Sequence, residues 1–198
     1  GQHKNKEDEK KGIELLQQAS DKGCIRAIVI LGFCYYSGDG VSQDKKKAIE
    51  LFQRAADMGN ADAMLFLAVC YDEGDGVSQD KKKVFELLQK VADKGDAEST
   101  FNIAVRYQNG EGVPQDKKKA IELYRRAADM GNTNAMFNLA LCYSKGYGIS
   151  LDKKKAIELY QKAADMGNTN AMVNLAVRYH KGDGVSQDKK KAIELYQR

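Results

Sequence analysis

Few side chains in this sequence are of the types that carry out catalysis or bind metal ions. The 198 residues include two histidines and four cysteines. His3 lies near the start of the sequence, and His180 has no neighbours of the catalytic-triad type at a readable spacing. The stretch Asp72-Glu73-Gly74-Asp75 lacks the remaining ligands of a calcium-binding loop. We therefore expect no catalytic centre, no metal and no cofactor.

The most prominent charged feature is a lysine triplet. Lys45-Lys46-Lys47 recurs at 81–83, 117–119, 153–155 and 189–191. Such a stripe can attract phospholipid or RNA. However, Glu50 and Arg54 follow Lys46 at helical spacing and neutralise much of the charge, and no aromatic residue interleaves with the lysines to stack on bases. The net charge is only +4. We therefore favour a solvated face over a nucleic-acid or membrane site.

The lysine triplets belong to a repeat of 36 residues that organises nearly the whole chain. The loop sequence Gly38-Asp39-Gly40 returns with this spacing from Gly74, Gly110, Gly146 and Gly182, and a second glycine series runs through Gly23, Gly59, Gly95, Gly131 and Gly167. Regular glycines indicate helix ends, because glycine adopts positive φ without a Cβ clash. A period of roughly 20–50 residues is typical of a solenoid.

Each repeat is expected to form two helices, called A and B. Helix B runs from an N-cap at Asp44 to Met58 and has one apolar face. Helix A begins at Asn60 and ends before Gly74, and in the first repeat Cys24 stands at the N-cap position that Asn60 occupies. No strand pattern is present. The sequence thus predicts an all-α, right-handed superhelical solenoid of tandem helix-turn-helix repeats, with six B helices, the last incomplete, and five A helices.

The expected organisation is a disordered leader or tag remnant over residues 1–7, followed by a solenoid over 8–198 that is truncated within a repeat at both ends. The sequence begins with glycine rather than methionine, so we expect the natural N-terminus to be missing. No apolar run approaches the length needed to cross a bilayer. Exposed apolar sides of the terminal helices predict end-to-end self-association.

Two motifs carry a family resemblance. They are Ala63-x-x-x-Leu67-Ala68-x-x-Tyr71-x-x-Gly74-x-Gly76-Val77-x-x-Asp80 in helix A with its loop, and Lys119-Ala120-x-x-x-Tyr124-x-x-Ala127-Ala128-x-x-Gly131 in helix B. Over residues 8–198 the chain resembles the Sel-one-like repeat family, a relative of the tetratricopeptide repeat. The resemblance implies an α/α solenoid that acts as an adaptor scaffold in protein complexes. Cysteine-rich members of that family pair two cysteines within each repeat and have been linked to hydrolase activity.

Three asparagines, Asn102, Asn138 and Asn174, share one position of helix A. The resemblance places helix A on the concave side, where amide groups can bind the main chain of a peptide. Arg106 and Arg178 share another position and can receive a ligand carboxylate. For the asparagines, the alternatives are a solvated polar face or hydrogen bonds to a neighbouring helix. For the arginines, the alternative is an ion pair with a neighbouring repeat.

The asparagine position turns apolar in the earlier repeats, where Ile30 and Phe66 occupy it and Phe33 lies nearby. If exposed, these residues form a hydrophobic patch that binds a partner. The alternative is packing between adjacent A helices. We favour packing for the position of Val69, because Val105, Leu141 and Val177 are also apolar there.

Cys34, Cys70 and Cys142 share one helix A position, so they are expected about 10 Å apart or more, too far for a disulfide. Unpaired cysteines slightly favour a cytoplasmic location. The expected function is a non-catalytic scaffold that holds a peptide or partner surface in a concave groove. The alternatives are an electrostatic binder of anionic lipid or nucleic acid, a structural spacer of a larger protein, and a hydrolase.

Overall fold

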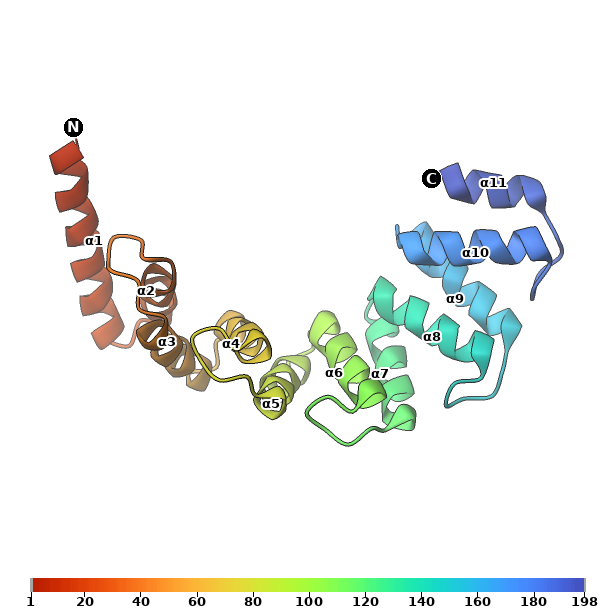
Figure 1. Ribbon diagram of the computed structural model, residues 1–198, viewed down its shortest axis with the longest axis horizontal. Helices are drawn as coiled ribbons and strands as arrows, with labels where there is room; N and C mark the ends of the chain where they lie inside the picture. The colour runs from red at the N-terminus through yellow and green to blue at the C-terminus, as the bar shows by residue number, and fades with distance from the viewer. Residues whose placement is uncertain (1, 198) are drawn as a thin grey trace. The chain divides into compact units, whose positions relative to one another are not determined.

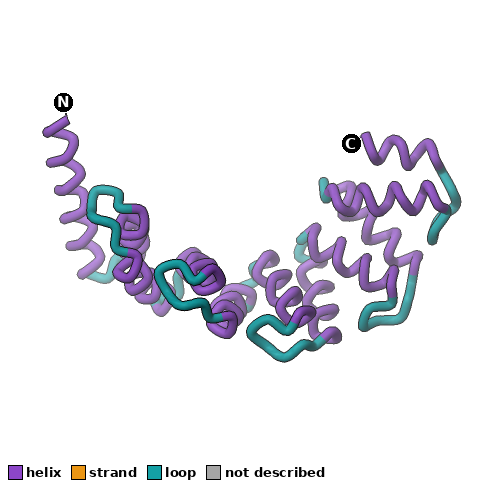
Figure 2. Tube along the Cα trace, viewed as in Figure 1, coloured by secondary structure: helices purple, strands orange, loops and turns teal. Residues whose placement is uncertain are grey.

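The computed structural model describes residues 2–197, with side chains from Glu7 onward. Within these residues there are eleven helices and no strand (Figure 2). The helices are α1 (Gln2–Asp21), α2 (Ile25–Ser37), α3 (Lys45–Asp57), α4 (Ala61–Glu73), α5 (Lys81–Ala92), α6 (Ala97–Asn109), α7 (Lys117–Asp129), α8 (Thr133–Lys145), α9 (Lys153–Asp165), α10 (Thr169–Lys181) and α11 (Lys189–Gln197). The all-α architecture of tandem helix pairs is confirmed.

The chain divides into two compact units, residues 1–91 and 92–198 (Figure 1). In the first unit α2 packs against α1 and α3, and α3 packs against α4. In the second unit the consecutive helices from α6 to α11 pack in the same way. Large side chains at one position of helix B lie at the centre of the packing, with Phe52 fully buried in the first unit and Tyr124 and Tyr160 in the second.

Helix boundaries follow from capping residues at one end and glycines at the other. The Asp44 carboxylate accepts the backbone N–H of Lys47 at 3.0 Å, and Asn60 Oδ1 accepts that of Ala63 at 2.8 Å. Cys24 has the same extended backbone at the start of α2 but makes no side-chain capping bond. At the end of α2, Gly38 adopts φ +80°, a conformation that favours glycine. The predicted helix ends are therefore correct to within a residue.

The loop between helices A and B is fastened by a glutamine. The Gln43 side-chain amide donates to the Tyr36 carbonyl at 2.9 Å. Gln79, Gln115 and Gln187 make the equivalent bond in their own loops. In the fourth loop Leu151 stands in place of glutamine, and 59% of it is exposed. That loop therefore lacks the side-chain bond that fastens the other four.

Helix α1 is longer than the sequence suggested. A disordered leader was expected over residues 1–7, whereas α1 begins at Gln2 and runs for 20 residues. Its described part corresponds to a helix B, and α2 packs against it.

Candidate interaction surfaces

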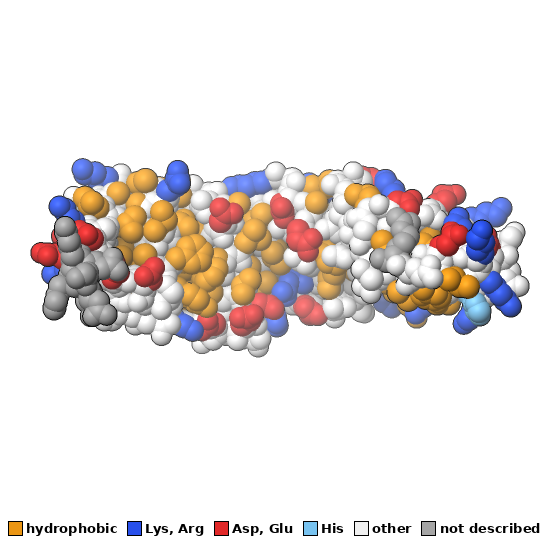
Figure 3. All heavy atoms as spheres, turned by 90° about the horizontal axis from the view of Figure 1, so that it is seen from above, with side chains coloured by type: hydrophobic (Ala, Val, Ile, Leu, Met, Phe, Trp, Pro, Cys, Tyr) orange, Lys and Arg blue, Asp and Glu red, His pale blue; other side chains and the backbone are white. Residues whose placement is uncertain are grey.

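An apolar patch, defined as Ile30, Phe33, Phe66 and Val69, lies on α2 and α4 in the first unit. Ile30 and Phe33 are one helical turn apart on α2 and are 44% and 42% exposed. The Phe66 ring is half-buried, with its centroid 4.9 Å from that of Phe33, so the two helices share one surface. Hydrophobic side chains gather over this end of the chain in Figure 3. Phe33 and Phe66 therefore pack between two A helices, which was one interpretation. Ile30 and Phe33 are also partly exposed, as an apolar binding patch requires.

Val69 is more exposed than expected from the sequence. Packing was favoured because this position is apolar in every repeat, yet Val69 is 50% exposed. Val105, the equivalent residue of α6, is partly buried against the core of the second unit. An apolar residue type predicts burial only where a neighbouring side chain covers it, and the side chain of Val69 faces solvent.

The three asparagines are not equivalent in the second unit. Asn138 Nδ2 lies 3.3 Å from the hydroxyl of Tyr124 on the preceding helix. Asn174 Nδ2 donates to the carbonyl of Asn170, one turn earlier in its own helix, at 2.9 Å. Asn102 is half-buried. Binding to a neighbouring helix, one of the alternatives for this position, is thus seen for Asn138.

Polar residues beside the asparagine position connect successive repeats. The capping residue Asn132 donates from Nδ2 to Glu98 at 2.7 Å, and Asn168 donates to Asn134 Oδ1 at 3.0 Å. Each bond joins the start of one helix A to the start of the helix A before it. Part of this polar face is therefore structural.

The two arginines meet carboxylates of their own repeats. Arg178 lies 2.6 Å from Asp183, in the loop that follows its helix, and only 12% of its side chain is exposed. Arg106 is buried, and its Nη1 is 3.8 Å from Glu111, which occupies the same loop position. An ion pair with a neighbouring repeat was the alternative to binding a ligand carboxylate. The observed partners instead belong to the same repeat, because the loop folds back over the end of helix A.

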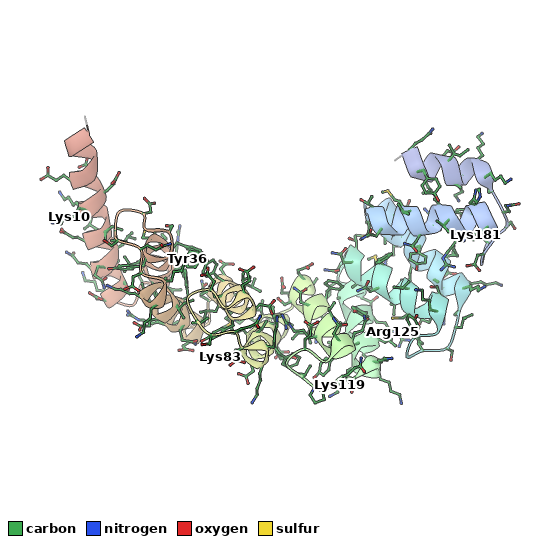
Figure 4. The ribbon with its side chains drawn as sticks, in the orientation of Figure 1. Lys10, Tyr36, Lys83, Lys119, Arg125 and Lys181 are labelled. Carbon is green, nitrogen blue, oxygen red and sulfur yellow. The ribbon has the colours of Figure 1, made fainter. Side chains whose placement is uncertain are left out.

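The lysine triplets are largely exposed, as expected for a solvated face, and several of their side chains also contact other residues. The third lysine lies over a tyrosine of helix A in its own repeat, and the distance from Nζ to the ring centroid is 4.1 Å for Lys47 over Tyr35. Lys83 and Lys119 (labelled in Figure 4) lie over Tyr71 and Tyr107 at 4.7 and 5.2 Å, and Lys155 and Lys191 repeat the contact. A tyrosine in every helix A was the sequence signal for this cation–π column.

In two triplets the first lysine bridges to the loop of the next repeat, whereas Lys81 pairs with Asp72 of its own repeat. Lys45 Nζ is 2.6 Å from Asp75, and Lys153 Nζ is 2.7 Å from Asp183. The Tyr36 hydroxyl, labelled in Figure 4, also donates to Asp75. The bonds from Lys45 and Tyr36 lower the pKa of Asp75, and the bond to Asp75 raises the pKa of Tyr36 to about 12. The middle lysine remains exposed.

The four cysteines are free. Cys24 is exposed and Cys34 is half-buried, whereas Cys70 and Cys142 are buried, and burial raises the pKa of Cys70 to about 11. No group of three or more histidine, cysteine or acidic side chains that could hold a metal ion occurs in the described part of the chain. None of the described helices has the length and apolar character that a bilayer crossing needs.

Comparison with known proteins identifies the family to which the repeats belong. The profile of the Sel1 repeat matches six segments, 4–24, 25–60, 61–96, 97–132, 133–168 and 169–198. Among solved structures, the chain is similar to a Sel1 repeat protein from Oxalobacter formigenes, with 32% identity over 96% of this chain and 78% of that one and a TM-score of 0.79. No curated protein matches the sequence.

A second similar structure is a protective antigen present in uropathogenic Escherichia coli strains, which displays the SLR fold. The identity is 30%, and the TM-score is 0.85. The match covers 96% of this chain but spans only 41% of the length of the antigen. The Helicobacter pylori cysteine rich protein B is 24% identical over 65% of this chain, with a TM-score of 0.50, and shares the fold.

Proposed function

Because the chain belongs to the Sel1 repeat family, whose members are generally protein-interaction scaffolds, we propose that it is a non-catalytic scaffold whose first unit binds an apolar segment of a partner protein. The observation that carries the proposal is the exposure of the apolar patch on α2 and α4. Ile30, Phe33 and Val69 are each between 42% and 50% exposed. Contiguous exposed apolar surface is typical of sites that bind other proteins.

The construction of the patch supports a role in recognition. Phe66 packs on the fully buried ring of Phe52, with centroids 4.6 Å apart, so the floor of the patch is anchored in the core. A rigid aromatic floor with exposed aliphatic side chains around it loses little conformational entropy when a partner binds. Burying the exposed side chains would contribute about 25 cal/mol for each Å² of apolar area removed from water.

In the second unit, Asn102, Asn138 and Asn174 are proposed to hydrogen-bond the main chain of a bound segment. The side-chain oxygens of Asn138 and Asn174 remain available, because the bonds described above use only their Nδ2 groups. Arg106 and Arg178, proposed from the sequence as anchors for a ligand acid, could serve a ligand only by exchanging Glu111 and Asp183 for it.

Selection from a random peptide library displayed on phage tests the proposal with a defined probe. Peptides that the wild-type chain enriches should contain an apolar core. Their binding should fall at least tenfold in an Ile30→Lys, Val69→Lys double variant, because two charges then replace apolar surface. A triple Asn102→Ala, Asn138→Ala, Asn174→Ala variant tests the amide contribution separately.

Met166→Lys is the matched control, since Met166 is a comparably exposed apolar residue in the second unit. It should leave peptide binding unchanged. Peptides that bind the wild type and the double variant equally would overturn the apolar patch, and failure to enrich any peptide would contradict peptide binding by this chain.

A further inference from the structure

The first lysine of a helix B can lie beside the loop that follows the next helix A. This arrangement is described at three lysines, Lys45, Lys117 and Lys153. Its backbone geometry is the same each time. The second glycine of the loop approaches the lysine so closely that a Cβ added to Gly76, Gly148 or Gly184 would lie 3.0 to 3.1 Å from the lysine Cβ. The loop residue just before that glycine is therefore presented to the lysine in the same way in all three places.

In two of the three places the chain fills this position with its own charged groups. Between the start of α3 and the loop after α4, Asp75 pairs with Lys45 and also accepts a hydrogen bond from Tyr36. Between the start of α9 and the loop after α10, Asp183 pairs with both Lys153 and Arg178. A carboxylate thus sits beside the lysine ammonium in each case, and a large side chain from helix A completes the contact.

The third place, between the start of α7 and the loop after α8, lacks these groups. Tyr147 replaces the aspartate, and Cys142 stands where Arg178 stands in the next repeat. Gln108, shorter than Tyr36 at the same position, accepts the Tyr124 hydroxyl at 2.9 Å and lines the same place. Tyr147 is 55% exposed, and Lys117 has no carboxylate partner in the described part of the chain. The substitutions remove one carboxylate and leave one ammonium group unmatched.

A cavity of about 260 Å³ opens at this place. Its polar lining consists of Gln108, Asn109, Lys117 and Tyr147, and its apolar lining of Ala120, Ile121 and Tyr124, with the buried thiol of Cys142. Small-molecule sites typically enclose about 300–1,000 Å³, so this cavity suits a ligand smaller than a drug. The amides at the start of α7 do not form the site, because the Asp116 side chain already accepts two of them.

We propose that this cavity is a binding site for a carboxylate carried on a short aromatic or aliphatic arm. The carboxylate pairs with Lys117, in the position that Asp75 and Asp183 fill in the other repeats, and the arm lies in the cavity against Ile121. Tyr147 covers the ligand from the loop. The carboxylate belongs either to a free small acid or to the C-terminal residue of a peptide, since both present the same group. This site is separate from the apolar patch and does not depend on it.

The leucine at position 151, where the other four loops have glutamine, supports the same site. Four loops are tied to helix A by a glutamine, and the loop that carries Tyr147 is the one without it. Tyr147 therefore sits on a loop that can adjust around a ligand more easily than its equivalents.

Titration of the ¹⁵N-labelled full chain with 3-phenylpropanoate, followed by NMR, tests the proposal. Saturable shifts are expected at residues around Lys117, Cys142 and Tyr147. The neutral amide, 3-phenylpropanamide, should bind at least about tenfold more weakly, because it cannot pair with the ammonium group. A dipeptide that ends in phenylalanine, compared with its C-terminal amide, distinguishes a peptide end from a free acid.

Two variants test whether the residues that differ between the repeats are responsible for binding. Tyr147→Asp restores the carboxylate of the neighbouring repeats and should abolish binding of 3-phenylpropanoate, and Lys117→Gln should weaken it at least about tenfold. Lys153→Gln, at the same repeat position but already paired with Asp183, is the control and should bind as wild type. An unchanged circular dichroism spectrum establishes that each variant is folded. Absence of saturable shifts, equal binding of acid and amide, or undiminished binding by Tyr147→Asp would each overturn the proposal.

Discussion

At the scale of single residues, the Asp75 carboxylate joins two repeats of the first unit. It receives Lys45 from α3 and the Tyr36 hydroxyl from α2, and both bonds lower its pKa. A carboxyl group whose pKa is lowered in the folded state contributes stability that is complete above its ordinary pKa of about 3.9. That contribution disappears as the pH falls through the lowered value.

We therefore predict that Asp75→Asn lowers the free energy of unfolding at pH 7, and that the difference from wild type shrinks as the pH falls from about 5 to 2. Urea denaturation at a series of pH values measures both effects. Asp39→Asn is the matched control. Asp39 has the same loop position, but Glu9 stands where Lys45 stands, so no lysine is available to it. Equal losses in the two variants at pH 7, or a difference that does not change with pH, would contradict this role for Asp75.

At the scale of the helix, side-chain capping bonds determine which helix N-termini are stabilised. Asn60, Asn132 and Asn168 each accept a backbone N–H from the residue three positions later, at 2.8 to 2.9 Å. Cys24 begins α2 with φ −69° and ψ 104°, close to the −73° and 116° of Asn60, yet its thiol makes no capping bond. The backbone at Cys24 is already arranged for a cap that the side chain does not supply.

Cys24→Asn is therefore expected to stabilise the chain by about 1 kcal/mol, since a capping side chain is typically worth about that much. The reverse change, Asn60→Ala, should cost about the same. Chemical denaturation of both variants beside the wild type measures the effect. If Cys24→Asn left stability unchanged while Asn60→Ala reduced it, the similarity of the two backbones would not be sufficient for capping.

Helix positions were predictable from the sequence because their causes are local. Asp44 caps the helix that follows it directly, and Gly38 ends the helix that precedes it. The contacts of the candidate sites were less predictable, because their partners are distant in sequence. Tyr36 and Asp75 are 39 residues apart, and the direction in which Val69 faces depends on what lies beside α4. Comparison of equivalent positions could have revealed the lysine–tyrosine column and the unusual loop at Tyr147.

At the scale of the whole molecule, the helices B named α3, α7 and α9 each pack against a helix A on either side. Ile49 and Phe52 of α3 are buried in this way, as are Ile121 and Tyr124 of α7. The equivalent residues of α11, Ile193 and Tyr196, are 56% and 54% exposed in the 198-residue chain. The same residue types thus form core in one repeat and exposed apolar surface in another, according to whether a neighbouring helix is present.

Such a face lowers its free energy when another apolar surface covers it, because burial removes its area from water. We therefore predict that the 198-residue chain self-associates as its concentration rises, and that an Ile193→Glu, Tyr196→Glu variant remains monomeric at the same concentrations. Sedimentation velocity over a wide concentration range measures the difference. Met166→Glu, which changes a 51% exposed residue outside α11, is the control and should associate as wild type. A wild-type chain that stays monomeric throughout would contradict the prediction, and association that persists in the α11 variant would move the contact to another surface, with Leu15 of α1, 58% exposed, the first to test.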